Sequence, residues 1–186
     1  MDSPAATMTP PRRAYWLSVA ALVAVLPVTL AVHVWGDVAN WRAAYERTPV
    51  EAAAGRPVDY AGARWTVTRF TRLAGDAGRA VVLAEFEAAA ADLKALGAVP
   101  CEVKLSDDAS RKWDPVLFAD PIVQKMYPET MDMGLCGGPT FAAAEPGKPA
   151  RMAASFVIPA SAKDLRLSIT LFSALPAHLS VSEPGP

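Results

Sequence analysis

The sequence predicts a mainly β domain outside a membrane, preceded by one N-terminal transmembrane helix. Two observations carry this prediction: an uncharged apolar run near the N-terminus, and several short alternating apolar–polar segments after it. The 17 prolines among 186 residues favour a loop-rich β domain, because proline suits turns and strand edges better than the interior of helices. The roughly 150 residues after the run are enough for one ordinary domain.

The apolar run covers residues 14–35 and contains no charged side chain. At a helical rise of ~1.5 Å per residue it reaches about 33 Å, enough to cross a hydrocarbon core of ~30 Å. Trp16 near its start and Trp35 at its end are aromatic residues typical of the two membrane interfaces. Pro27 lies inside the run, and membrane helices tolerate proline more readily than soluble ones.

A cleaved signal peptide is the alternative interpretation of this run. Such a peptide has an apolar region of only ~7–15 residues and a small-residue cleavage site. Here the run is longer, and the small residues Ala31 and Ala39 have the poorly fitting neighbours His33 and Asp37. We therefore expect an uncleaved anchor, with a secreted domain released by cleavage as the alternative.

The charges beside the run predict the orientation of the chain. Arg12 and Arg13 precede it, whereas the first charge after it is Asp37, so the positive-inside rule places the N-terminus in the cytoplasm. The predicted location is thus the cell membrane, crossed once, with the main domain extracytoplasmic. The expected parts are a cytoplasmic tail (1–13), the transmembrane helix (14–35), a juxtamembrane helix and linker (36–60), a β-sandwich (61–175) and a disordered tail (176–186).

Period-two patterns predict the strands of the domain. They cover residues 65–73, 79–88, 101–105, 151–158 and 165–171, and the last of these is the most regular. Phe70 breaks the alternation in the first strand, which indicates a bulge near Arg69. An alanine-rich helix or loop should follow residue 88. Short strands separated by turn residues are typical of a β-sandwich.

Cys101 and Cys136 are the two cysteines of the chain. An even pair in an oxidising compartment predicts a disulfide bond. A metal site is the weaker reading, because there is no C-x-x-C motif and neither His33 nor His178 lies near a cysteine in the sequence. We expect neither a metal nor another cofactor.

Residues 113–133, WDPVLFADPIVQKMYPETMDM, form a long segment inside the predicted disulfide ring. Long loops in compact domains are usually functional, and methionine and aromatic residues are enriched at adaptable interfaces. The candidate partner-binding residues are Phe118, Ile122, Met126, Tyr127 and Met131. The alternative is that these side chains fold back over the core. The pattern favours the core for Phe118, and the surface for Met126 and Tyr127.

No constellation of catalytic residues is visible, so the chain is not expected to be an enzyme. His178 is the only histidine outside the apolar run, and there is no G-x-S-x-G motif or phosphate-binding glycine loop. Asp107, Asp108 and Asp114 are typical of a polar turn. Balanced charge, with 18 basic and 19 acidic residues, argues against nucleic acid as a partner. An envelope hydrolase with an unrecognised site stays as an alternative.

Several motifs resemble an immunoglobulin-like domain of unknown function found on bacterial lipoproteins and single-span membrane proteins. They are G-x-R-W-T-V, V-V-L-A-E-F, V-K-L-S-D-D, P-G-K-P-A-R-M-A-A-S-F-V-I-P and D-L-R-L-S-I, within residues 61–172. The resemblance implies an exported immunoglobulin-like β-sandwich and no catalytic chemistry. The expected function is binding or scaffolding in the bacterial cell envelope. The expected partners are membrane lipid through the N-terminal helix, and a protein or envelope polymer through the domain.

Overall fold

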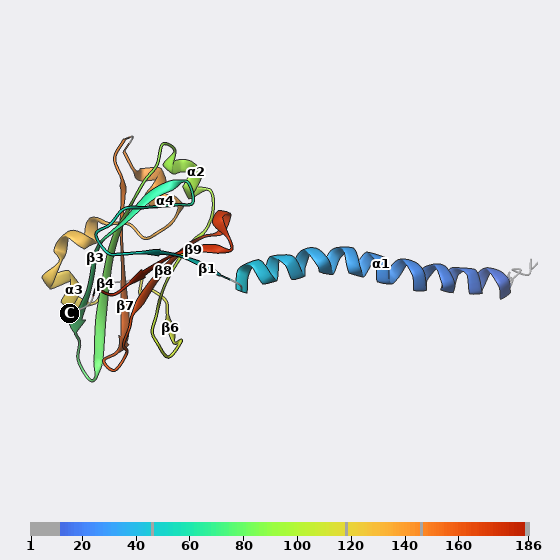
Figure 1. Ribbon diagram of the computed structural model, residues 1–186, viewed down its shortest axis with the longest axis horizontal. Helices are drawn as coiled ribbons and strands as arrows, with labels where there is room; N and C mark the ends of the chain where they lie inside the picture. The colour runs from blue at the N-terminus through green and yellow to red at the C-terminus, as the bar shows by residue number, and fades with distance from the viewer. Residues whose placement is uncertain (1–11, 46, 118, 146, 185–186) are drawn as a thin grey trace, which may run out of the picture. The chain divides into compact units, whose positions relative to one another are not determined.

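The computed structural model describes residues 12–45, 47–117, 119–145 and 147–184. The chain divides into two compact units, Met1–Tyr45 and Glu46–Pro186, and each is described by itself. Figure 1 shows the first as one helix and the second as a sandwich of strands with short helices at its margins.

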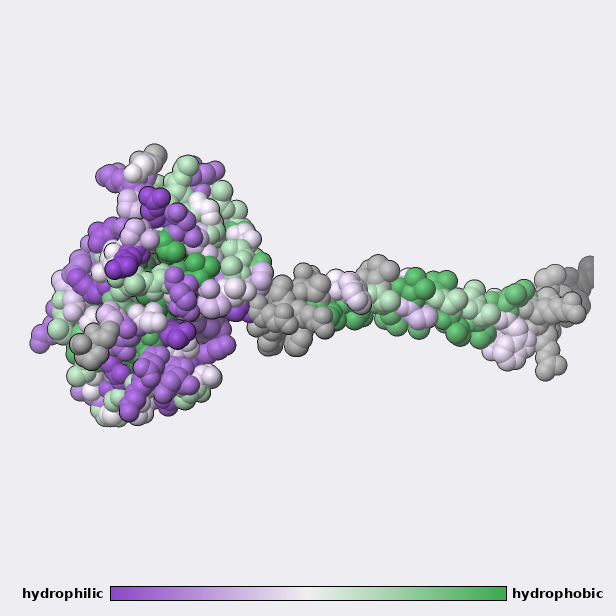
Figure 2. Space-filling view, viewed as in Figure 1, coloured by the Kyte–Doolittle hydropathy of each residue, from purple (hydrophilic) through white to green (hydrophobic). Residues whose placement is uncertain are grey.

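The first unit contains helix α1, Arg12–Tyr45, which continues through Pro27. Its segment Ala14–Val38 is long and apolar enough to be a membrane span or a signal sequence. Figure 2 shows apolar side chains along the described part of this segment. The hydroxyl of Thr29 donates to the carbonyl oxygen of Val25 at 2.8 Å, so this polar group is satisfied within the helix. The helix ends at Tyr45, within the predicted juxtamembrane helix and linker at 36–60.

The second unit is a β-sandwich of two sheets. The first sheet is antiparallel, in the order β2 (Val58–Tyr60), β3 (Ala63–Ala74), β4 (Arg79–Ala89), β7 (Ala150–Pro159). The second sheet has the order β1 (Thr48–Ala52), β9 (Ala177–Ser182), β8 (Arg166–Leu171), β5 (Cys101–Ser106), β6 (Lys112–Trp113). Its strands are antiparallel except that β1 runs parallel to β9. The short helices are α2 (Leu93–Gly97), α3 (Pro121–Met126), η1 (Pro128–Asp132), α4 (Gly138–Ala143) and η2 (Phe172–Ala174).

The alternating patterns place one side of each strand in the core. In β8, Leu167, Ile169 and Leu171 are fully buried, as the regular alternation there predicts. In β3 the pairing with β4 shifts between Val67 and Arg69, so the predicted bulge is present. The extra residue returns Phe70 to the buried side.

Ala–Gly turns lie between strands of the first sheet. Ala61 and Gly62 join β2 to β3 with φ of 52° and 78°. Ala77 and Gly78, with φ of 54° and 75°, end the four-residue connection between β3 and β4. Positive φ at both central positions is typical of the type I′ turn, whose twist matches that of paired strands. These turns fix the register of β2, β3 and β4.

The predicted linker up to residue 60 is wrong, because the sandwich already includes β1 and β2. Val50 in β1 pairs with Leu179 in β9 and packs against the core. The sequence conceals this strand because it is five residues long and contains Pro49, a residue otherwise typical of turns. Proline is tolerated here because β1 is an edge strand.

The predicted disordered tail at 176–186 is also wrong over most of its length. Residues 177–182 form β9, which lies between β1 and β8. Leu179 and Val181 are almost fully buried, so their alternation in H-L-S-V-S was a strand signal. The proline residues on both sides of this segment led to the prediction of a tail.

Candidate partner-binding surface

Residues 119–133, which we name the cap, cover part of the outer face of the first sheet. Figure 1 shows α3 beside this sheet. Val123 of the cap is fully buried against Leu73, Val81 and Leu83. These three sheet residues, which we name the apolar strip, point away from the main core. The cap therefore covers an apolar part of a surface that would otherwise meet solvent.

The cap is helical because of residues at its start. The carboxylate of Asp120 accepts a hydrogen bond from the backbone N–H of Ile122 at 3.0 Å, and Pro121 occupies the first turn. Both features are typical of a helix N-terminus. Pro128 then opens η1. Two short helices thus occupy residues 121–126 and 128–132 of the long loop predicted at 113–133.

The predicted binding residues lie in two environments, at the exposed surface and against the apolar strip. Met126 and Met131 are exposed, by 54% and 55%. Ile122 and Tyr127 are half-buried and pack against the apolar strip, so the surface position expected for Tyr127 is only partly correct. Phe118 lies outside the described residues. Some side chains of this segment are therefore exposed, whereas others pack against the sheet.

Two further apolar residues, outside the predicted binding set, lie beside the cap. Leu117 is 78% exposed and Leu135 is 48% exposed. Together with Met131, they border a pocket of about 140 Å³ between the cap and the sheet, whose floor includes Leu83 and Ala153. Exposed apolar groups around a small pocket are the kind of surface that proteins use to bind each other.

Arg69 of β3 joins the cap to the sheet. Its Nη1 lies 2.8 Å from the Oε1 of Glu85 on β4 and 3.0 Å from the Oε1 of Glu129 in the cap. The guanidinium carbon lies 4.3 Å from the ring centroid of Tyr127, a geometry that attracts a cation to an aromatic face. One side chain from the sheet thus contacts two side chains of the cap.

The two carboxylates around Arg69 have opposite pKa shifts. Burial raises the pKa of Glu85, with a further rise from the nearby charge of Glu129 and an opposing effect of Arg69. The pKa of Glu129 is lowered, first by a hydrogen bond from its own backbone and then by Arg69. The charged form of Glu129 is therefore favoured in the folded protein, and that of Glu85 is not.

The disulfide ring encloses the cap. Cys101 at the start of β5 and Cys136 after η1 have sulfur atoms at bonding distance, and their Cα atoms are 5.7 Å apart. This is an ordinary Cα separation for a disulfide. A bond here fixes one end of the cap segment to the second sheet.

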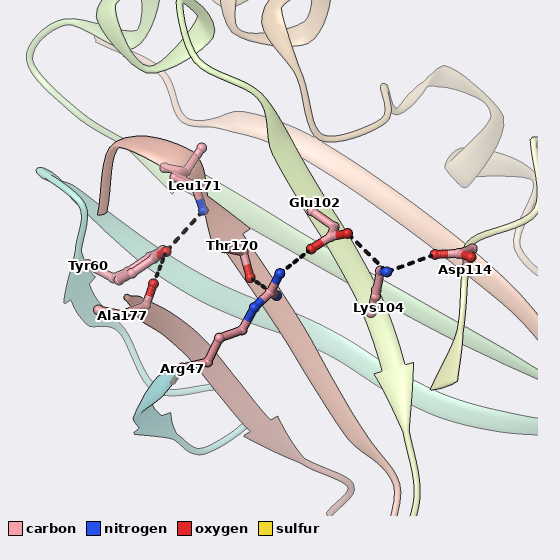
Figure 3. A network of polar contacts seen from close by, with 8 residues as sticks. All are labelled: Arg47, Tyr60, Glu102, Lys104, Asp114, Thr170, Leu171 and Ala177. Carbon is pink, nitrogen blue, oxygen red and sulfur yellow. Dashed lines mark hydrogen bonds and ion pairs between the residues drawn. The ribbon is translucent and has the colours of Figure 1, made fainter. Parts of the chain in front are cut away.

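A second polar cluster lies on the second sheet (Figure 3). Arg47 donates to the hydroxyl of Thr170 at 3.0 Å and to Glu102 at 2.9 Å, and Lys104 lies 3.0 Å from Glu102 and 3.7 Å from Asp114. Burial alone would raise the pKa of Glu102, but hydrogen bonds from Arg47 and Lys104 outweigh it and lower that pKa. This cluster stabilises the pairing of the second sheet across β8, β5 and the residues beside them.

Tyr60 connects the two sheets close to that cluster. Its hydroxyl donates to the carbonyl oxygen of Ala177 at 3.1 Å and accepts from the backbone N–H of Leu171 at 3.0 Å. Tyr60 belongs to the first sheet, whereas Leu171 and Ala177 belong to the second. Neither this contact nor the Arg47 cluster was found from the sequence, because their members are far apart along the chain.

The aspartate-rich turn has a structural role. The side chain of Asp107 is fully buried, and it accepts hydrogen bonds from the backbone N–H of Arg111 at 2.9 Å and from its Nε at 2.8 Å. Among the residues that the structure describes, no group of three histidine, cysteine, aspartate or glutamate side chains is arranged to hold a metal ion.

Comparisons with known proteins identify no family for this chain. No protein-family model matches it, and no curated protein matches it. A search of solved structures finds an uncharacterized β-sandwich protein from Clostridium difficile 630. That match has a TM-score of 0.43 and 10% sequence identity, and it covers 74% of this chain and 96% of the other.

Proposed function

We propose that this protein is a membrane-anchored binding module of the bacterial cell envelope, which contacts a partner protein through the cap and its neighbours. α1 is the anchor, and the β-sandwich is displayed on the extracytoplasmic side. Arg12 and Arg13 before the span, with Asp37 after it, support this orientation. A secreted form released by cleavage is a second candidate, because α1 also passes as a signal sequence.

The distribution of exposed apolar side chains carries the proposal. Among the described residues of the second unit, five large apolar side chains are exposed, and four of them belong to residues 117–135. The four are Leu117, Met126, Met131 and Leu135, and the fifth is Phe172 of η2. Single exposed apolar residues are ordinary on protein surfaces, whereas a group of them indicates a contact surface. Methionine adapts its shape to different partners.

We also propose that the sandwich is immunoglobulin-like. The adjacency β3-β4-β7 in one sheet and β9-β8-β5-β6 in the other follows the A-B-E and G-F-C-C′ adjacency of such domains. The chain crosses between the sheets after β4, after β6 and after β7, as a Greek key does. The disulfide differs, because Cys101 bonds to a segment outside the strands instead of linking B to F. Immunoglobulin-like domains commonly bind through segments outside their strands, which fits a binding role for the cap.

Photo-crosslinking in intact cells tests the binding surface. We expect a photoreactive amino acid at Met131 to trap a partner protein, and the same amino acid at Phe172 to trap none. Phe172 is the matched control because it is also apolar and exposed, but lies outside the cap. Equal products from both positions, or no product from Met131, would contradict the proposal.

A polar substitution gives an independent prediction. When the photoreactive amino acid is placed at Leu117 instead, the additional substitution Met131→Ser should lower the yield of crosslinked partner about tenfold. It should change the free energy of unfolding by less than about 0.5 kcal/mol, since surface substitutions usually do. Thermal unfolding of the purified variant checks the second part. A large fall in melting temperature would instead assign Met131 to the core.

A further inference from the structure

We propose that the cap is a lid that opens from the sheet as a unit, with the Arg69–Glu129–Tyr127 contact as its latch. The proposal extends the binding function to the regulation of the same surface, and it rests on that function for its biological meaning. In this opening, residues 119–133 move away from the sheet while the sandwich stays folded.

Backbone hydrogen bonds to β7 fix the segment at both ends. At one end the backbone N–H of Val116 donates to the carbonyl oxygen of Ser155 at 2.8 Å. At the other, the N–H of Ala153 donates to the carbonyl oxygen of Gly134 at 3.0 Å, and Cys136 follows. These points lie on β7 on either side of the cap, so they are the hinges about which residues 119–133 move.

Within the described part of the chain, one polar side-chain contact joins the cap to the sheet, between Arg69 and Glu129. The backbone hydrogen bonds of the cap are local. The N–H groups of Val123 and Tyr127 donate to carbonyl oxygens within the cap, at 2.9 and 2.7 Å. Opening therefore breaks one charged contact, the stacking of Arg69 on Tyr127, and the packing of Ile122, Val123 and Tyr127 on the apolar strip. Helices this short are not stable without tertiary packing, so their amides exchange from the open form.

Opening also has a consequence for binding. It uncovers the apolar strip Leu73, Val81 and Leu83, which the closed cap buries. It enlarges the pocket bordered by Met131, because that pocket lies between cap and sheet. A partner that binds the uncovered strip would shift the population toward the open form.

The charges around the latch make its strength depend on pH. Arg69 on β3, Glu85 on β4 and Arg151 on β7 face Glu129 and Tyr127 in the cap. The pKa of Glu129 is lowered in the folded protein. Its contribution is thus present above the pKa of the unfolded chain, and it is lost as pH falls through the folded value. Acidification far enough to protonate Glu129 should favour the open lid.

Native-state hydrogen exchange of the purified protein tests the latch without any partner. In Glu129→Gln, the amides of Val123 and Tyr127 should exchange about fivefold faster, since a partly exposed charged contact is lost. Adding Tyr127→Leu should raise this to about thirtyfold. Amides of β4 and β7 should change by less than about twofold. Asp132→Asn is the matched control, because it removes an exposed carboxylate from the same short helix, and it should leave exchange unchanged.

Two results would overturn the lid. One is equal acceleration of cap and β4 amides in Glu129→Gln, which would show that the cap unfolds only with the whole sandwich. The other is indistinguishable exchange in Glu129→Gln and Asp132→Asn, which would remove the latch. A lid that opens as expected in a protein that traps no partner would sink the proposed function and leave this inference standing.

Discussion

Trp65→Ala should lower the free energy of unfolding of the sandwich by about 3–5 kcal/mol, because it removes a large side chain from the centre of the core. Trp65 is fully buried. Its ring centroid lies 6.3 Å from that of Tyr60, 6.4 Å from Phe86 and 6.3 Å from Phe141. The indole N–H also donates to the carbonyl oxygen of Tyr60 at 3.0 Å.

This side chain connects parts of the chain that the strands alone do not join. Phe141 belongs to α4, which packs against α2 so closely that a Cβ on Gly138 would lie 2.9 Å from the carbonyl oxygen of Gly97. Loss of Trp65 should therefore loosen α4 as well as β3. Trp65→Phe is the control, because it retains an aromatic ring and should cost clearly less. Denaturant unfolding followed by circular dichroism measures both, and a loss below about 1 kcal/mol for Trp65→Ala would contradict the packing.

Cys136→Ser should destabilise the domain by about 2–5 kcal/mol. The bond joins residues 35 positions apart, so its loss frees the segment that contains the cap. We expect free-thiol labelling of the native protein to be near zero before reduction. In the variant, hydrogen exchange should increase most in residues 113–133, because that segment loses its tether.

The double variant Cys101→Ser, Cys136→Ser separates loss of the bond from the presence of a free thiol. It should match the single variant and the reduced wild type in stability. Full labelling of both cysteines without reductant would show that the pair is not bonded in the native protein. If the oxidised and reduced wild-type proteins were equally stable, the bond would not stabilise the domain, which would contradict the prediction.

The sequence predicts best those features that depend on nearby residues. The apolar run of α1, the alternation in β8 and the bulge near Arg69 are all local patterns. β1 and β9 were missed for a different reason. Each is short and has proline nearby, and their parallel pairing joins residues 129 positions apart, such as Val50 and Leu179. The pairing itself leaves no local signal, and in β9 the flanking prolines outweighed the alternation of H-L-S-V-S.

The candidate site was predicted in part. Its methionines are visible in the sequence because an apolar group in a proline-rich segment is unusual. Asp120 before Pro121 was a signal for the start of a helix. It was missed because the whole segment was interpreted as a loop. Arg69 and Glu129 are separated by 60 positions, so a latch between them follows only once β3 and the cap are placed together.

The state of the N-terminus in the membrane fraction tests membrane anchoring most directly. We expect the chain to stay in membranes washed with alkaline carbonate, to need detergent for extraction, and to begin at or near Met1 by mass spectrometry. On intact cells with a permeable outer layer, an external protease should digest the β-sandwich and spare the residues before α1. A soluble or secreted chain that begins after residue 30, or a sandwich protected from external protease, would contradict the membrane-anchored, extracytoplasmic module.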